Sequence, residues 1–485
     1  MKRIKNFLFY SFPAVLFFSY YPLLSLGSNA SMNFEFSLPL IWLFCFALLS
    51  LKDFYDFLIS LKSKKSPWIL KLALLFPLYL SLSIVWSPNP LRAVLTSGIV
   101  WCIFISLAGF CSILKSKNLN LSLLKKVFLV SASLVCLFCW LQCFLDVFGV
   151  SRETTLLCLG CTSRIFGFPH PSGFAIEPQF MGNLLLAPTL YSIYLYTKTE
   201  QKVKKPNEKS IPFLLLLFSS TLFLTFSRGA IYAFAVGLAV FLVVSLVKKL
   251  FPLSVALKTL ALTLVAFLFA LTAQGIFSEL SSTNDTFSSG VAKSLNQLSL
   301  GIIDFRTTKI QSPEDTTEES VAESSVASSD DENPENPENF SVFDGYVEES
   351  TNFRLDLNAY ALSASLDSPA NFLFGYGLGS AGTVMFEKGF TSSPKEIVQN
   401  EYFSLLLETG LLGLLLFFAV LILFFYETKK SLGVSLEGIF LASLSVAFLI
   451  TLSFFSGLPN ALHLYLLPPL FLFSFQTRIG HKSKS

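Results

Sequence analysis

The sequence predicts an all-α polytopic membrane protein with about twelve transmembrane helices and one large extracytoplasmic loop between helices 9 and 10. Three observations support this class. The 485 residues are 53% hydrophobic and 14% charged, whereas soluble domains carry roughly a quarter charged residues. The apolar residues gather in runs that are long enough to cross ~30 Å of hydrocarbon as helices. The loops between these runs alternate in charge.

The expected spans follow from the apolar runs in chain order. They lie near 7–26, 36–52, 69–86, 93–114, 124–148, 181–197, 211–227, 230–247, 258–277, 401–426, 436–456 and 460–476. The first run follows Lys2, Arg3 and Lys5, as in a signal peptide, but its length and the lack of a small-residue cleavage site favour an uncleaved helix. One helix over 211–247 would be too long for a single crossing and would place Arg228 in mid-bilayer, so two spans are expected there.

The alternation of loop charge predicts the orientation of the spans. Seven loops or termini are rich in lysine and arginine, whereas the intervening loops carry little beyond single arginines. Loops rich in these residues stay in the cytoplasm. We therefore expect a multi-pass protein of the cytoplasmic (inner) membrane with both termini cytoplasmic. The net charge of +3 does not indicate a nucleic-acid partner, because the basic residues lie in membrane-flanking loops.

The chain divides into three segments: nine spans over 1–277, the extracytoplasmic loop over 278–400, and three spans with a cytoplasmic tail over 401–485. Residues 311–350 of the loop are acidic and serine-rich and include ENPENPEN. Such a composition buries too little apolar surface to fold, so a disordered insertion is expected, with calcium or cell-wall binding as the alternative. After it, residues 354–366 are expected to form a helix and residues 372–382 a glycine-rich turn.

The cysteines do not predict a metal site. Six lie within spans, where cysteine serves as a small packing residue: Cys45, Cys102, Cys111, Cys136, Cys139 and Cys143. Cys158 and Cys161 form an external C-x-x-C pair, which is only half a metal site. A local disulfide between them and two free thiols are both open. We expect no metal and no other cofactor.

Two arginines are the main candidates for chemistry, because charges near the membrane are costly to keep there. Arg228 lies in FSRGA at the external end of a span, beside Gly229. Arg354 ends the long stretch without lysine or arginine that follows Lys309. The plain alternatives are an interfacial arginine that reaches the headgroups and a surface salt bridge. Because a guanidinium offers a fork of donors that matches phosphate oxygens, both are predicted to bind one diphosphate.

A third candidate is the loop RIFGFPHPSGFAIEPQF over 164–180. It holds Arg164, His170 and Glu177, which can transfer protons or bind phosphate, on a backbone made irregular by glycine and proline. A lone loop histidine is most often only solvated. The sequence has no P-loop, dinucleotide fingerprint, G-x-S-x-G or H-E-x-x-H motif. An external enzyme without access to nucleotides needs an activated substrate, such as a lipid-linked diphosphate.

This arrangement resembles the O-antigen ligase and polymerase family of bacterial envelope glycosyltransferases, which have about twelve helices and a large external loop between the ninth and the tenth. The resemblance covers most of the chain. It is most specific in the WSPNP-LR turn, the GFPHP…EP run, FSRGA, and the stretch from FRLDLNAYAL through FGYGLGS to QNEYFSLLLETGLLG. In the family ligases, a His is followed directly by Asn, Ser or Gln. A Gly comes after nine further residues, and a Gly, Thr or Tyr comes after two more. The same spacing here gives Gln399, Asn400, Gly410 and Gly413.

The departure from the family pattern is Gln399, which occupies the histidine position. In the ligases this histidine is thought to help deprotonate the acceptor hydroxyl, and an amide cannot act as a general base. The chain is therefore either a polymerase-like member or an enzyme that uses Glu177 or Glu401 as the base. Arg228 and Arg354 do match the positions at which the family binds diphosphate.

The resemblance implies an inverting, metal-independent glycosyltransferase, either polymerase or ligase, that acts on the external face of the membrane. The donor would be a glycan on undecaprenyl diphosphate or a similar polyprenyl diphosphate, and the acceptor a glycan or glycolipid, with membrane lipids as the other partner. Its expected catalytic residues are Arg228, Arg354, Gln399 and Glu177, and its expected substrate-binding residues are Arg164, His170, Asn400 and Glu401. Gly410 and Gly413 would share a helix face and let the tenth helix pack closely on a neighbour.

Two other classes of function remain open. One is a flippase or transporter of lipid-linked glycans, although such proteins usually show internal repeats and charges along a central path, and we find neither. The other is a non-catalytic envelope scaffold. The sequence does not specify the sugar, the linkage or the acceptor.

Overall fold

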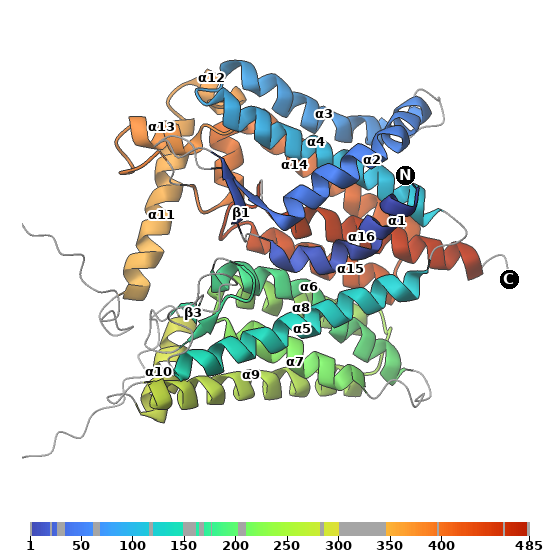
Figure 1. Cartoon of the computed structure of the whole chain (residues 1–485), viewed down its shortest axis with the longest axis vertical. Coiled ribbons are helices and arrows are strands. Elements are labelled where there is room, and N and C mark those ends of the chain that lie inside the picture. Colours follow the sequence, from blue (N-terminus) through green and yellow to red (C-terminus); the bar gives the residue numbers. More distant parts are fainter. Residues whose placement is uncertain are drawn as a thin grey trace, which may run out of the picture.

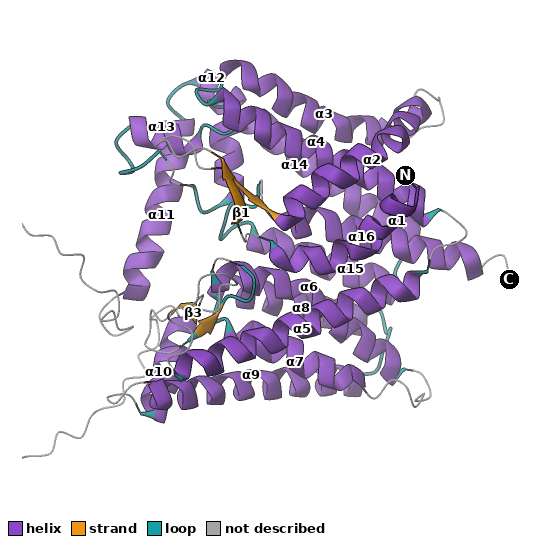
Figure 2. Cartoon of the chain, viewed as in Figure 1, coloured by secondary structure: helices purple, strands orange, loops and turns teal. Residues whose placement is uncertain are grey.

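The computed structural model describes residues 2–19, 22–26, 34–61, 68–115, 120–148, 162–163, 169–175, 177–201, 210–281, 286–299, 346–394, 397–458 and 461–482. These residues are mostly helical, with two short hairpins (Figure 2). Arg164, Cys158, Cys161 and nearly all of the predicted insertion at 311–350 lie outside the described residues, and the predictions made for them stay predictions.

The helices and strands have the following bounds. The helices are α1 (Lys2–Val15), α2 (Leu38–Leu61), α3 (Trp68–Leu82), α4 (Pro90–Leu114), α5 (Leu121–Val147), α6 (Pro178–Glu200), α7 (Ser210–Leu224), α8 (Arg228–Val247), α9 (Leu253–Ser281), α10 (Phe287–Leu298), α11 (Tyr346–Ser365), α12 (Pro369–Phe374), α13 (Ala381–Glu387), α14 (Glu401–Leu432), α15 (Leu436–Thr451) and α16 (Leu462–Lys482), with short 3-10 helices at Leu16–Phe18 and Ser83–Trp86. The strands are β1 (Pro22–Leu26), β2 (Phe34–Ser37), β3 (Thr162–Ser163) and β4 (His170–Pro171).

The long helices lie side by side in one bundle, and both termini are at the same end of it (Figure 1). We call this the terminal end. The opposite end, the loop end, carries α10 to α13 and both hairpins (Figure 1). Helix α11 runs across the ends of the long helices rather than along them (Figure 1). The loop end is therefore where segments that are distant in sequence meet.

Each apolar run predicted as a span contains a helix. Among the described residues, six helices are long and apolar enough to cross a membrane, and three shorter apolar helices accompany them. This confirms the helical membrane class, and the total of twelve spans stays a prediction. The pair of spans predicted around Arg228 is two helices, because α7 ends at Leu224 and α8 begins at Arg228.

The first predicted span, 7–26, is only partly helical. Helix α1 ends at Val15, and Pro22–Leu26 forms strand β1 instead, paired antiparallel with β2. A short apolar run fits a strand as well as a helix, so hydrophobicity alone does not distinguish the two. Pro22 starts the strand, and a proline with no N–H to donate is tolerated at the first position of a strand.

Helix α6 is the centre of one half of the bundle. Every residue from Met181 to Thr197 is buried, and α6 packs against α7, α8 and α15. At the terminal end, Lys198 of α6 forms an ion pair with Glu437 of α15, and the Tyr194 hydroxyl donates to the same carboxylate over 2.9 Å. Because α6 is enclosed and anchored in this way, its first residues have a fixed place at the loop end.

Candidate functional site

The site at the loop end begins with Asn400, which caps the N-terminus of α14. Its Oδ1 accepts the backbone N–H groups of Tyr402 over 3.0 Å and of Phe403 over 3.3 Å. Its Nδ2 donates to the Ser453 carbonyl over 3.1 Å. Asparagine is a preferred N-cap residue, because its side chain satisfies the first free amides of a helix. Asn400 thus fixes α14 to the turn over 452–458, which follows α15.

Glu401 is bound to the same turn and is only 1% exposed. Its Oε2 accepts from the Ser456 hydroxyl over 2.9 Å, from the Gly457 amide over 2.6 Å and from the Leu458 amide over 3.3 Å. Its own backbone N–H donates to the Leu452 carbonyl over 2.8 Å. With three donors on one oxygen, this carboxylate serves as an anchor for the turn.

The turn over 452–458 then contacts the starts of α6 and α8. Gln179 Nε2 donates to the Phe454 carbonyl over 3.2 Å. A Cβ added to Gly229 would lie 3.0 Å from the Phe454 Cβ, so the backbone beside Arg228 packs directly on this phenylalanine. Two of the sequence motifs, EPQF and FSRGA, are therefore held against one residue.

Arg354 reaches the same place from α11. Its Nη2 donates to Gln179 Oε1 over 3.3 Å. The buried face of α11 carries Leu357 and Ala361, which pack in one cluster with Leu407 of α14. Residues three or four positions apart share a helix face, so Arg354 continues this face by one turn toward α6. The two arginines predicted to act together thus come from helices that meet at Gln179 and Phe454.

The starts of α6 and α8 lie side by side and favour anions. A Cβ on Gly182 of α6 would lie 2.9 Å from the Ser227 Cβ, which leaves room for glycine only. Within the described residues, neither N-cap residue, Glu177 or Ser227, makes a side-chain capping bond. The Ser227 hydroxyl is buried and also has no hydrogen-bond partner there. Helix N-termini with unoccupied amides carry a partial positive charge and bind phosphates.

His170 lies behind this region. It is 3% exposed, and its ring stacks on Phe226 with the ring centroids 5.7 Å apart. Burial lowers the pKa of His170 to about 3, so the imidazole is neutral at ordinary pH. Its loop is held by Gln142, whose Oε1 accepts the Gly173 amide over 2.8 Å. In this position His170 supports the α7–α8 turn, in which Phe226 has a φ of 46°.

The remaining predicted residues are distributed as follows. Glu177 is exposed and stands two positions before Gln179. Gln399 is half-buried and immediately precedes the cap of α14. The structure therefore brings Arg354, Gln179 and the backbone beside Arg228 together near Phe454, and Asn400 contacts the neighbouring Ser453 carbonyl.

The prediction for Gly410 was wrong. It does not lie on a helix face shared with Gly413, because its φ of 65° and ψ of −174° break α14. Such a conformation is almost exclusive to glycine. Gly413 does allow close packing, since a Cβ there would lie 3.1 Å from the Tyr79 ring. The requirement for glycine at position 410 thus comes from its backbone conformation and from the close approach of α12 (Pro369–Phe374), not from a face shared with Gly413.

Sequence reasoning also missed two residues. Gln179 joins Arg354 to Phe454, and only its place in the EPQF run gave any signal. Glu408 is an acidic residue within the apolar run of α14 and is 8% exposed. An ionisable residue inside a span is a functional candidate by default, and this rule would have selected it.

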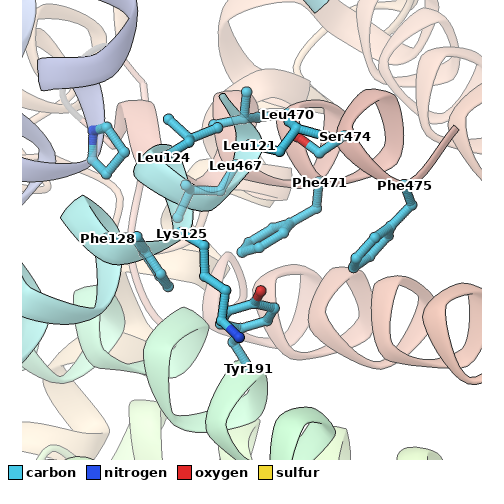
Figure 3. Close-up of a pocket in the computed structure, with 11 residues that line it drawn as sticks. Leu121, Leu124, Lys125, Phe128, Tyr191, Leu467, Leu470, Phe471, Ser474 and Phe475 are labelled. Carbon is cyan, nitrogen blue, oxygen red and sulfur yellow. The ribbon is translucent and has the colours of Figure 1, made fainter. Parts of the chain in front are cut away.

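One small pocket within the bundle is not the substrate site. It has a volume of about 50 Å³ and lies between α1, α5, α6 and α16, with Lys125 and Tyr191 in its lining (Figure 3). Sites for small ligands usually measure roughly 300–1,000 Å³. A lipid-linked glycan therefore does not fit there.

The fold is that of a helical membrane protein, in which segments that carry Arg228 and Arg354 meet at one end of the bundle. The family model for O-antigen ligase matches residues 213–418. The match includes Arg228, Arg354, Gln399 and the break in α14, and it confirms the predicted resemblance. Residues 213–418 are thus similar to O-antigen ligases. A search of curated proteins finds no match to the chain.

Proposed function

We propose that the chain is a glycosyltransferase that moves a glycan from a polyprenyl diphosphate, such as undecaprenyl diphosphate, to an acceptor glycan or glycolipid. The observation that carries this proposal is the meeting of Arg354 and the Arg228 turn at Gln179 and Phe454. Guanidinium groups that two different helices bring to the same end of the bundle are suited to a ligand of high negative charge. A diphosphate carries the charge and the oxygen geometry that two guanidinium groups bind best.

The electrostatic role of the site concerns the leaving group. Negative charge grows on the diphosphate oxygen as the bond to the sugar breaks. Donors already in place where that charge develops stabilise the transition state without a cost of reorganisation. Arg228, Arg354 and the uncapped starts of α6 and α8 are such donors. The neighbouring Ser227 hydroxyl can donate one further hydrogen bond.

The reaction is a single displacement that inverts the anomeric centre. The acceptor hydroxyl oxygen attacks the anomeric carbon, and the bond from that carbon to the diphosphate oxygen breaks. The polyprenyl diphosphate leaves with the electron pair, and a base takes the hydroxyl proton. Glu177 is our candidate for this base, because its carboxylate is exposed at the site while that of Glu401 already accepts three hydrogen bonds.

Gln399 does not act as the general base, because an amide does not accept the proton of the acceptor hydroxyl. Its half-buried position beside the α14 cap is suited to orienting the acceptor hydroxyl. We propose Arg164 as a further substrate-binding residue from the neighbouring loop. Asn400, Glu401 and His170 support the site from behind, through their contacts with the turns that carry it.

The loop end is proposed to face the outside of the cytoplasmic membrane. The terminal end carries the basic residues of α6, α8 and α14, including Lys198, Lys248 and Lys429. Basic flanks of this kind stay in the cytoplasm. The diphosphate site would then lie at the outer leaflet, where a flipped lipid-linked glycan is presented.

A strain that lacks the gene tests this function. Accumulation of the lipid-linked glycan on the outer leaflet supports the enzyme, whereas accumulation on the inner leaflet would point to a flippase. The glycan on the acceptor then separates the two reactions of the family. A single repeat unit indicates a lost polymerase, and an acceptor without glycan indicates a lost ligase. Unchanged envelope glycan would contradict the proposal.

A further inference from the structure

Glu408 is a buried acidic residue that the proposed reaction does not use. It lies on α14, two positions before the helix breaks at Gly410, and it is 8% exposed. A carboxylate in a span is costly to bury unless hydrogen bonds and opposite charge compensate for the lost water. The partners of Glu408 therefore indicate its role.

The break in α14 leaves helix carbonyls that need donors from elsewhere. Residues 375–380, which we call the glycine loop, supply two of them. Tyr376 N–H donates to the Leu407 carbonyl over 3.0 Å, and Gly377 N–H donates to the Glu408 carbonyl over 2.8 Å. The Tyr79 hydroxyl donates to the Thr409 carbonyl over 2.8 Å. The glycine loop and α3 thus supply the hydrogen-bond donors that the backbone carbonyls of α14 lack at the break.

The glycine loop fits between α14 and the turn before α4 without spare room. A Cβ on Gly375 would lie 2.5 Å from the Thr409 amide nitrogen, and one on Gly377 would lie 2.5 Å from the Ser87 Cα. The Ser87 hydroxyl donates to the Leu378 carbonyl over 2.8 Å. The loop is therefore held from both sides.

The side chain of Glu408 closes this arrangement. Its Oε1 accepts the Ala381 N–H at the start of α13 over 3.2 Å. The same carboxylate accepts from the Gly379 N–H, and the charge of Arg92 on α4 acts on it. Glu408 thereby attaches the start of α13 and the end of the glycine loop to the broken segment of α14.

Helix α13 in turn determines where α11 lies. Val384 and Met385 of α13 share one buried cluster with Leu357 and Ala361 of α11 and with Leu407 of α14. Arg354 extends the same face of α11 and donates to Gln179. A displacement of α13 would thus move α11, and with it the guanidinium at the diphosphate site.

We propose that Glu408 is a positioning residue that holds Arg354 at the diphosphate site through the glycine loop, α13 and α11. The effect on catalysis rests on the proposed function, whereas the effect on the position of Arg354 does not. Glutamine at 408 retains an oxygen that accepts from the Ala381 N–H. Alanine leaves both backbone donors without an acceptor. The two substitutions therefore separate positioning by hydrogen bonds from a need for a base or a charge.

The first test measures the position of α11 without any substrate. Cysteines placed as Arg354→Cys and Gln179→Cys, in a background without the eight native cysteines, should cross-link with a short bifunctional thiol reagent in membranes. We expect Glu408→Gln to retain the cross-link. Glu408→Ala should lower its yield about tenfold, the factor that corresponds to one lost hydrogen bond to a charged group. An unchanged yield in Glu408→Ala, or an equal loss in both variants, would overturn the proposal.

The second test measures transfer with Arg354 intact. In Glu408→Ala we expect the KM for the lipid-linked donor to rise about tenfold or more, because the guanidinium that binds the diphosphate is displaced, and Glu408→Gln should largely restore it. Equal loss of kcat in both variants with an unchanged KM would identify Glu408 as a base and refute positioning. If Arg354→Ala is fully active while the cross-link still depends on Glu408, the proposed function fails and the positioning role stands.

A further variant covers the case in which Glu408→Ala does not accumulate in the membrane. Ser87→Ala removes the donor to the Leu378 carbonyl and loosens the glycine loop from its other side. We expect a partial loss of the same cross-link in a protein that keeps its elution position in size-exclusion chromatography. A full yield in Ser87→Ala would contradict the chain of contacts from the glycine loop to α11.

Discussion

The break at Gly410 gives the sharpest prediction about stability. Gly410 has a φ of 65° and a ψ of −174°. An alanine in this backbone conformation is strained by about 1–3 kcal/mol. A Cβ there would also lie 2.5 Å from the Phe374 amide nitrogen of α12, so α12 would have to shift. Forcing α12 away would weaken the hydrogen bonds of the glycine loop to α14, each worth about 1 kcal/mol.

The expected cost of Gly410→Ala is therefore about 2–4 kcal/mol of the free energy of unfolding, the sum of backbone strain and one lost hydrogen bond. Gly433→Ala is the matched control. Gly433 has a similar backbone, with a φ of 57° and a ψ of −149°, but a Cβ there would meet nothing within 4 Å. Backbone strain alone should therefore lower the free energy of unfolding of Gly433→Ala, by about 1–3 kcal/mol.

Thermal or denaturant unfolding of the purified protein in detergent compares the two variants. We expect Gly410→Ala to unfold at a clearly lower temperature than Gly433→Ala, and both to unfold below the wild type. Equal stability of the two alanine variants would refute the claim that α12 and the glycine loop pack directly into the break.

Three further predictions concern the site. Asn400→Ala removes the two capping bonds of α14 and should cost about 1 kcal/mol or somewhat more, whereas Asn400→Asp should retain most of that stability, as measured by the same unfolding assay. Glu177→Gln should lower kcat for transfer by about 10²–10⁴-fold with the thermal stability unchanged, and a wild-type rate would remove Glu177 as the base. The pKa of His170 is about 3 in the folded protein against an ordinary 6.5, so below pH 6.5 the unfolded chain binds a proton that the folded chain does not. Stability should then fall as the pH drops from 6.5 toward 3, by up to about 1.4 kcal/mol per pH unit, and His170→Phe should show a shallower decline in unfolding scans at pH 7 and pH 5.

The helices could be predicted because an apolar run of sufficient length has few alternatives in a membrane. Each expected span contains a helix, and the helix expected over 354–366 corresponds to the second part of α11, which ends at Ser365. The exception, β1, shows the limit of this rule. Its residues are as apolar as those of a span, and only the pairing with Phe34–Ser37 decides their conformation.

The site could be predicted only in part, because side-chain partners depend on contacts between distant segments. The convergence of Arg354 with the Arg228 turn followed from the resemblance to the family, whereas the residues that produce it, Gln179 and Phe454, did not. Asn400 stands directly before an apolar run, which is the sequence signal of an N-cap. The break at Gly410 gave no local signal, since the donors that complete it come from residues 376 and 377.

The most direct test of the central claim measures glycan transfer by the purified protein in liposomes, with a polyprenyl-diphosphate-linked glycan as donor. Arg228→Ala and Arg354→Ala should each lose transfer by at least about a hundredfold, the effect of removing one donor to developing charge. Lys258→Ala, which removes a cation that pairs with Glu200 near the terminal end, should retain the wild-type rate. Wild-type transfer in either arginine variant, with normal amounts of folded protein, would contradict the diphosphate site.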